Sequence, residues 1–267
     1  MRRSDDGLTT RNGTPVEIES DLLKRPLWAT DFTRFSFRPR NDAALIFPYR
    51  VSAESYSVIP ENELREGWPQ AYAYLLSNKA RLERRKQYRE WYGFSAPRNL
   101  DVHQNAHLVV PLLADKGLAA PLVADSSAYC LMAGGGFSLR LRSADTLGDP
   151  LYVLGLVNSK LLFWYLRLIS NRFRGGWITC TKQYFGQLPI RVPAVASTSE
   201  RARHDALVAL VGRRVSLASR VDSITTPAES ASLDREVQAT ERQIDNLVYE
   251  IYEVSEADVA LVEDRRT

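Results

Sequence analysis

The sequence has few cysteines: Cys130 and Cys180 are the only two among 267 residues. Two cysteines are too few for a disulfide framework or a structural zinc site, and they fit a reducing compartment. Long apolar runs are also missing, since the longest, residues 161–169, contains Arg167 and is too short to span a bilayer. The opening residues, MRRSDDGLTT, lack the apolar segment of a secretory signal. We therefore expect a cytoplasmic protein with no membrane partner.

The sequence also lacks the motifs of several enzyme classes. We find no P-loop, no G-x-S-x-G elbow, no H-E-x-x-H zinc motif and no acidic pair followed by E-x-K. Gly134, Gly135 and Gly136 lack the G-x-G-x-x-G spacing and precede a strand pattern, so we expect a hairpin turn. His103 and His107 are four residues apart, but no metal motif accompanies them. We therefore expect no catalytic residue and no metal site in this chain.

Acidic residues are outnumbered until late in the chain. Residues 1–199 carry 26 Lys and Arg against 18 Asp and Glu, a net charge of +8. Residues 200–267 carry 9 against 14, a net charge of −5, and the two segments together give the total of +3. A basic body followed by an acidic segment indicates one surface for polyanions and another for a different partner.

One basic stretch, residues 158–190, contains no acidic residue at all. Its basic residues are Lys160, Arg167, Arg172, Arg174 and Lys182. Gly175 and Gly176 let the backbone turn with a positive φ or approach a partner closely. Positive charge without a neutralising carboxylate, beside a flexible backbone, is what a phosphate-bearing partner needs.

A second basic stretch, residues 79–98, carries seven basic residues against Glu83 and Glu90. On a continuous helix, Arg81, Arg85 and Arg89 would form a basic ridge, with aromatic side chains interleaved. Taken alone, the segment fits a solvated helix face equally well. The acid-free stretch at 158–190 favours a phosphate-binding surface.

Apolar periodicity predicts an α+β fold. We expect a strand end at 45–49, a long helix from about 68 to 92, strands at 107–113, 119–132 and 137–142, and a helix at 151–169. Helical spacing at 207–218 and 233–251 predicts an antiparallel hairpin, and Ser255 with Asp258 begins a last short helix. The expected division is an irregular N-terminal arm (1–40), an α+β recognition domain (41–193), and a helical hairpin with a short C-terminal helix (200–267).

Several segments together resemble the TaqI-like C-terminal specificity domain of adenine-N6 DNA methyltransferases and fused restriction–methylation enzymes. In order, they are VEIESDLLKRPLWATDFTRF, LIFPY, WPQAYAYLLSNKARLERR, EWYGFSAPRNLD, LYVLGLVNSKLLFWYLRLISNRFRGGW, KQYFGQLPI and IDNLVYEIYEVSEADVALVE. They extend from Val16 to Glu263, nearly the whole chain. The order and spacing of the segments carry the resemblance more than any single one does.

The resemblance implies a module that binds double-stranded DNA and selects the site at which a partner catalytic domain methylates adenine. That partner would carry AdoMet and the Asn-Pro-Pro-Tyr motif; this chain has neither, since Ile46 precedes Phe47-Pro48-Tyr49. The chain is thus expected to be a separated or truncated specificity portion of a restriction–modification or related phage-defence system. It would require no cofactor of its own. The expected DNA-binding residues are Arg81, Arg84, Arg85, Arg89, Lys160, Asn171, Arg172, Arg174, Gly175, Gly176, Thr181, Lys182 and Gln183.

Two alternatives remain open on the sequence. The chain could be a truncated or divergent adenine DNA methyltransferase that binds AdoMet at an unrecognised site. It could instead be an assembly subunit whose helical hairpin docks a methyltransferase subunit or another protein, with an incidental basic surface.

Overall fold

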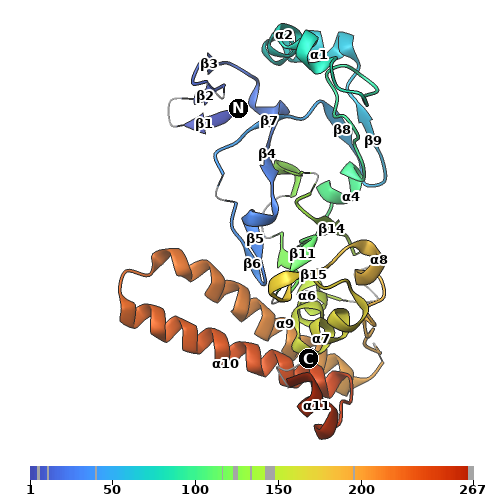
Figure 1. Cartoon of the computed structure of the whole chain (residues 1–267), viewed down its shortest axis with the longest axis vertical. Helices are drawn as coiled ribbons and strands as arrows, with labels where there is room; N and C mark the ends of the chain where they lie inside the picture. The colour runs from blue at the N-terminus through green and yellow to red at the C-terminus, as the bar shows by residue number, and fades with distance from the viewer. Residues whose placement is uncertain are drawn as a thin grey trace.

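The computed structural model of the chain describes residues 1–4, 7–10, 12–39, 41–115, 117–122, 126–132, 134–141, 148–194 and 196–263. Small sheets occupy the N-terminal and middle parts of the chain, and long helices follow. Figure 1 shows an elongated molecule in which a pair of long helices projects to one side, below the sheets. The predicted α+β fold with a C-terminal helical hairpin is confirmed.

Short strands occur among the described residues of the first forty, where the sequence led us to expect an irregular arm. Three of these strands make one antiparallel sheet: β1 (Arg2–Ser4), β2 (Gly7–Thr9) and β3 (Pro15–Val16). Strands β5 (Phe32–Thr33) and β6 (Ser36–Phe37) form a hairpin. Strands of two or three residues are too short to show the alternation by which a sequence reveals a strand.

Strand β4 (Leu23–Leu27) joins the N-terminal part of the chain to its middle. It pairs antiparallel with β7 (Leu45–Ile46) and parallel with β13 (Tyr129–Leu131). The strand end predicted at 45–49 is therefore present, and β8 (Tyr49–Val51) follows and pairs with β9 (Tyr56–Val58).

The helix predicted from about 68 to 92 is broken. The chain forms α1 (Glu61–Gly67), α2 (Pro69–Ser77) and α3 (Lys79–Leu82), and no helix continues beyond Leu82 in this segment. Pro69 does occupy the first turn of α2, as predicted. Trp91 and Tyr92 explain the break, because both are buried in a cluster with Leu64 and Leu75, and the chain must turn back to bring them there.

The middle of the chain builds a sheet from β10 (Leu108–Val110), β12 (Ala120–Pro121) and β14 (Phe137–Leu139). Helix α4 (Leu100–Gln104) precedes β10, and β11 (Leu113–Ala114) follows it. Strands β10, β11, β12 and β14 overlap the strands predicted at 107–113, 119–132 and 137–142. Residues 123–125 and Arg142 of those predictions lie outside the described part of the chain.

The predicted hairpin turn at the three glycines is instead a link between two sheets. Strand β13 before it pairs with β4, and β14 after it pairs with β10. Gly136 has a φ of 145°, and a Cβ placed there would lie 2.1 Å from the carbonyl oxygen of Val110. Glycine is required at this position because a side chain would collide with the neighbouring strand.

The helix predicted at 151–169 is two helices, α6 (Pro150–Asn158) and α7 (Lys160–Ile169), bent by 61°. Ser159 makes the break, since its side chain accepts a hydrogen bond from the Leu162 N–H and so caps α7. Helix α6 is buried on nearly all sides. Within the described residues, no single helix is long and apolar enough to cross a membrane.

The C-terminal part consists of α9 (Thr198–Ser219), α10 (Pro227–Ile251) and α11 (Glu256–Glu263). Helices α9 and α10 form the predicted hairpin (Figure 1). The predicted start of α11 is also confirmed, because the Ser255 hydroxyl accepts from the Asp258 N–H and donates to its carboxylate.

A polar cluster holds this helical hairpin to the N-terminal part of the chain. Arg34 donates to Glu241 (2.7 Å) and to the carbonyl of Asn158, the last residue of α6 (2.6 and 3.0 Å). Arg214 of α9 donates to the other Glu241 oxygen at 2.7 Å. Both guanidinium groups lie against the ring of Phe35, which is fully buried. One carboxylate thus joins the two long helices to the body.

Candidate nucleic-acid interface

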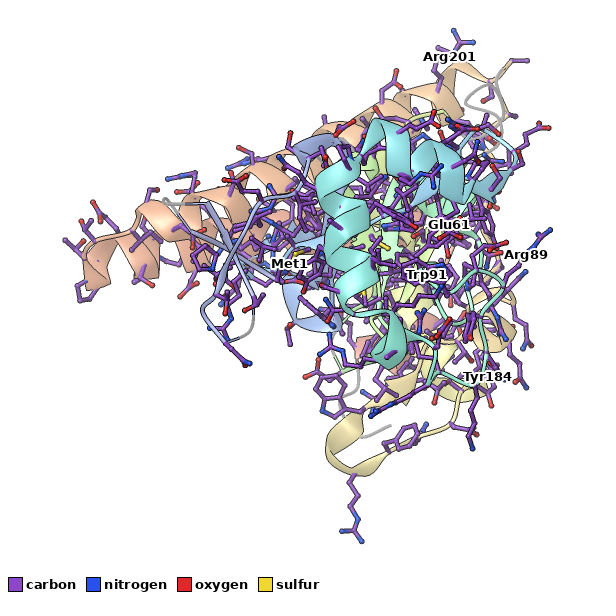
Figure 2. All side chains as sticks on the ribbon, turned by 90° about the horizontal axis from the view of Figure 1, so that it is seen from above. Met1, Glu61, Arg89, Trp91, Tyr184 and Arg201 are labelled. Carbon is purple, nitrogen blue, oxygen red and sulfur yellow. The ribbon has the colours of Figure 1, made fainter. Side chains whose placement is uncertain are left out.

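The segment of residues 170–183, here called the basic loop, leaves α7, makes a narrow antiparallel turn and returns to the body. The Phe173 N–H donates to the Trp177 carbonyl at 2.7 Å, and the Thr179 N–H donates to the Asn171 carbonyl at 3.0 Å. Arg172 and Ile178 form a bridge between these two hydrogen bonds. In Figure 2 the yellow part of the chain that contains the turn reaches outward from the body.

Two glycines make the tip of the basic loop. Gly175 has a φ of 77° and Gly176 a φ of 82°, within the short 3₁₀ turn η4 (Arg174–Gly176). Other residues rarely adopt a positive φ, so the tight reversal depends on this pair. The sequence analysis singled out both glycines for this property.

The ends of the basic loop are fixed to the body. Strand β15 (Ile178–Thr179) pairs with β11, and the Cys180 N–H donates to the Leu112 carbonyl at 2.8 Å. Ile178 and Cys180 are 1% and 0% exposed. Helix α8 (Lys182–Phe185) follows at once, with the Thr181 carbonyl accepting from two of its N–H groups. The loop is therefore held in one orientation rather than hanging free.

All residues from Asn171 to Trp177 are exposed. Lys182 and Gln183 are exposed as well, and Thr181 is half-buried. Arg172 makes one long hydrogen bond, 3.4 Å from its Nε to the Arg167 carbonyl, and within the described chain neither Arg172 nor Arg174 has an ion-pair partner. The structure thus brings eight of the predicted site residues together: Asn171, Arg172, Arg174, Gly175, Gly176, Thr181, Lys182 and Gln183.

The sequence analysis missed two residues of the basic loop, Phe173 and Trp177. Their side chains are 54% and 43% exposed, which is unusual for such large apolar groups. A count of charges does not detect them. Along residues 177–180 the buried Ile178 and Cys180 alternate with Trp177 and Thr179, and this alternation is the signal that could have found Trp177.

The other basic segment is arranged differently. Arg85 turns inward: its guanidinium donates to the carbonyls of Leu82 (2.7 Å), Gly93 (2.7 Å) and Trp91. Helix α3 ends at Leu82, so Arg81, Arg85 and Arg89 do not form the predicted helical ridge. The prediction is wrong because packing of the aromatic residues, rather than helix periodicity, determines where these arginines point.

The other predicted site residues of this segment, Arg81, Arg84 and Arg89, are exposed. Arg89 lies beside a cavity of about 140 Å³ that Tyr49 and Tyr56 also line. In Figure 2, Arg89 and Tyr184 of α8 lie toward the same side of the molecule. Arg81, Arg84 and Arg89 are therefore separate exposed side chains and not one helical ridge.

Lys160, predicted at the interface, is engaged by carboxylates. Its ammonium lies 2.6 Å from Glu263 of α11 and 3.9 Å from Asp245 of α10. The backbone N–H of Lys160 also donates a hydrogen bond to the Asp245 carboxylate at 2.9 Å. Burial raises the pKa of the Asp245 carboxyl, and the Lys160 N–H opposes that rise. Lys160 joins α7 to the C-terminal helices, which leaves less of its charge for a polyanion.

A cavity of about 620 Å³ lies next to β14, the strand whose Phe137 packs against Phe185 of α8 with ring centroids 5.3 Å apart. Arg85 and Arg98 line it from the first basic segment. The cavity therefore lies between that segment and strands β13 and β14. No cluster of three His, Cys, Asp or Glu residues suited to a metal occurs among the described residues.

His103 stands in the wall of this cavity as a structural residue. Its Nε2 accepts from the Leu131 N–H at 2.8 Å, so Nδ1 carries the proton and lies 2.6 Å from the Ser138 hydroxyl. Burial, with a smaller contribution from the charge of Lys24, lowers the pKa of His103 to about 4. The neutral ring connects α4 with β13 and β14.

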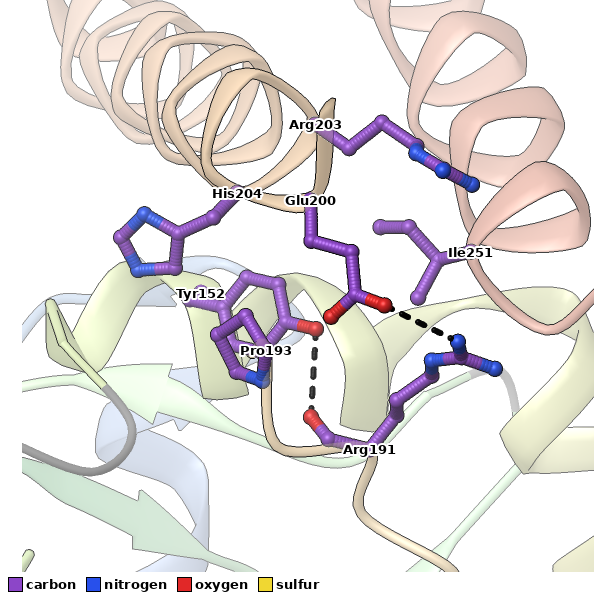
Figure 3. Close-up of a pocket in the computed structure, with 7 residues that line it drawn as sticks. All are labelled: Tyr152, Arg191, Pro193, Glu200, Arg203, His204 and Ile251. Carbon is purple, nitrogen blue, oxygen red and sulfur yellow. Dashed lines mark hydrogen bonds and ion pairs between the residues drawn. The ribbon is translucent and has the colours of Figure 1, made fainter. Parts of the chain in front are cut away.

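A second small pocket, shown in Figure 3, lies where α9 packs against the segment before it. The Tyr152 hydroxyl donates to the Arg191 carbonyl at 3.1 Å, and Arg191 lies 3.4 Å from Glu200. The Ala194 N–H, which donates to Glu200 at 2.5 Å, is the main cause that lowers the pKa of that carboxyl. With a volume of about 10 Å³, the pocket has room for a water at most.

Comparison with known proteins gives one distant similarity. No family model matches the chain. Over 273 aligned positions, the chain is 21% identical to the type II restriction enzyme and methyltransferase RM.Eco57I of Escherichia coli. The alignment covers 95% of this chain and 27% of that enzyme, so the chain spans about a quarter of the length of the protein it matches.

Proposed function

From this distant similarity to a restriction and modification enzyme, we propose that the chain is a DNA target-recognition module. In this role it directs an adenine-N6 methyltransferase to its site, as the TaqI-like resemblance suggests. The exposed, acid-free basic loop is the observation that carries the proposal. The loop has seven consecutive exposed residues and is fixed at both ends. Such a loop can enter a DNA groove in a defined orientation, which a mobile tail cannot.

The proposed contacts fall into two groups. Arg172, Arg174 and Lys182 contact phosphates, and the exposed arginines Arg81, Arg84 and Arg89 add further phosphate contacts. Base edges are read by polar side chains of the basic loop: Asn171, Arg172, Arg174, Thr181, Lys182 and Gln183. Arg85 and Lys160 are left out, since their charged groups are engaged within the chain.

AdoMet belongs to the catalytic partner in this proposal. The larger cavity beside His103 presents no carboxylate among the residues that line it, and Arg98 adds a positive charge. AdoMet carries a sulfonium cation and ribose hydroxyls, for which such a lining is unsuited. Calorimetry with AdoMet tests this part: heat of binding and methyl transfer by the isolated chain would instead favour the independent methyltransferase.

Salt dependence of duplex binding tests the proposal. The double variant R172A/R174A should lower the slope of log K against log salt by about 1.8, because each phosphate contact contributes about 0.9. Fluorescence anisotropy with a labelled duplex measures the slope. R242A, which removes an exposed arginine from α10, is the matched control and should leave the slope unchanged.

Failure to bind a duplex at low salt would overturn the proposal. If the chain nevertheless captured a methyltransferase subunit, the assembly function would replace it. Equal slopes for the wild type and R172A/R174A would remove the basic loop from the interface.

A further inference from the structure

Two aromatic side chains flank the tip of the basic loop and cover no part of the core. Phe173 stands before Arg174, Gly175 and Gly176, and Trp177 stands after them. Both are substantially exposed, at 54% and 43%. Exposing an aromatic ring to water is unfavourable, so a pair of them at a protruding tip indicates a surface that is covered by a partner.

The strand geometry directs this aromatic pair away from the body. Arg172 and Ile178 face each other across the turn, and Ile178 is buried. Successive side chains on extended backbone point to opposite faces. Phe173 and Trp177, one step nearer the tip on each side, therefore share the face opposite to that of Ile178 and point outward.

The pair is also held in place before any partner binds. The hydrogen bond from the Phe173 N–H to the Trp177 carbonyl closes the turn at 2.7 Å. A Cβ on Gly175 would lie 3.6 Å from Cδ1 of Trp177, so the indole lies beside the glycine at the tip. A rigid aromatic group loses little conformational freedom on binding, which favours its use as an anchor.

The charge around the pair identifies the chemistry of its partner. Arg172 and Arg174 are the sequence neighbours of Phe173, Lys182 follows at the end of the basic loop, and residues 158–190 contain no carboxylate. An apolar protein surface would leave these cations unpaired, whereas nucleic acid offers phosphates to the cations and stacked bases to the rings. Aromatic and aliphatic wedges of proteins enter the base stack of duplex DNA in this way.

We propose that Phe173 and Trp177 form a wedge that enters the base stack of bound duplex DNA, while the neighbouring basic side chains hold the flanking phosphates. The inference rests on the proposed DNA-binding function and adds that the DNA is locally unstacked. Because unstacking costs free energy, the wedge should favour a duplex in which one nucleotide is already unpaired.

A comparison of two duplexes tests the wedge. The wild-type chain should bind a duplex with one unpaired nucleotide about tenfold more tightly than the fully paired duplex, since a stacked base contributes about 1–3 kcal/mol. In F173A/W177A this preference should vanish, while the salt slope on the paired duplex stays the same because no charge is removed. W177F together with intact Phe173 should keep the preference, as a ring remains.

L261A is the matched control, because Leu261 of α11 is 59% exposed and lies outside the basic loop. Placing 2-aminopurine in the duplex gives a second readout, since its fluorescence rises when the stack opens. Salt-dependent binding by the wild type without a preference for the unpaired nucleotide, and without a rise in fluorescence, would overturn the wedge alone. Absence of duplex binding at low salt would overturn the proposed function as well.

Discussion

The two basic segments are alike in sequence and opposite in structure. Residues 79–98 and 170–183 both combine arginines, aromatic side chains and a change of chain direction. In the first, Trp91 and Tyr92 are buried and Arg85 binds three carbonyl oxygens. In the second, Phe173 and Trp177 point outward at a tip closed by backbone hydrogen bonds.

The two segments differ in which groups donate hydrogen bonds to the backbone carbonyls. Around Arg85, backbone carbonyls need a side-chain donor, so a guanidinium is taken inward. In the basic loop, pairing across the turn satisfies the backbone and leaves the side chains unused. A high density of positive charge therefore identifies an interface only where the backbone carbonyls already have backbone hydrogen-bond donors and do not need the basic side chains.

The largest expected effect that separates the two segments is on stability. R85A should lower the free energy of unfolding by about 3 kcal/mol, because it leaves several partly buried carbonyls without a donor. R89A, in the same segment, should change it by less than about 0.5 kcal/mol, since Arg89 is exposed. Urea denaturation of both variants measures the difference. A stable R85A protein would show that Arg85 is as free as the arginines of the basic loop.

A smaller effect concerns pH and His103, which lines the same cavity as Arg85 of the first segment. Folding lowers its pKa from 6.5 to about 4, so below pH 6.5 the unfolded chain binds a proton that the folded chain does not. This contribution to stability is complete above pH 6.5 and is lost as the pH falls toward 4, making the protein about 2 kcal/mol less stable at pH 5 than at pH 7.5.

Denaturation of the wild type and H103Q at both pH values isolates this contribution. The variant lacks the titrating ring and should lose stability less steeply with acid. Parallel pH profiles for the two proteins would mean that His103 is protonated in the fold, against the geometry of its bond from the Leu131 N–H.

The smallest effect is expected at Lys160, a basic residue of the acid-free stretch that is ion-paired. K160A should cost about 0.5 kcal/mol of stability, as is usual for an exposed ion pair. It should also alter the salt slope of duplex binding less than R174A does, because Glu263 already neutralises the charge. Equal slope changes in the two variants would return Lys160 to the interface.

The sequence predicted the parts of the fold that repeat over many residues. Helices α9 and α10 are 22 and 25 residues long, and their apolar stripes at a spacing of three and four are clear signals. Most strands of the N-terminal forty residues have only two or three residues and give no such signal, and the longest of them, β4, has its partners elsewhere in the sequence, at residues 45–46 and 129–131. Tertiary packing of Trp91 and Tyr92 overrode the helical pattern of residues 79–92.

For the candidate site, the sequence predicted which segment would carry exposed positive charge. It did not predict how the side chains of that segment are arranged. The lack of acidic residues and the Gly175–Gly176 pair pointed to the basic loop. That Arg85 binds backbone carbonyls, that Lys160 meets Glu263 and that Phe173 and Trp177 project outward all depend on contacts between segments far apart along the chain, or on the direction of a turn. Composition does not determine these.

The contact of Arg34 with Glu241 has a consequence for the order of folding. These residues are 207 positions apart, and β4 likewise waits for β13, its parallel neighbour. On the ribosome, β4 emerges before β13 and cannot complete its pairing until residues 129–131 have been made. Contacts between such distant segments slow the search for the native state. A nascent chain of this protein thus carries an unpaired edge on β4 until β13 is made, and Arg34 finds Glu241 only when α10 is released.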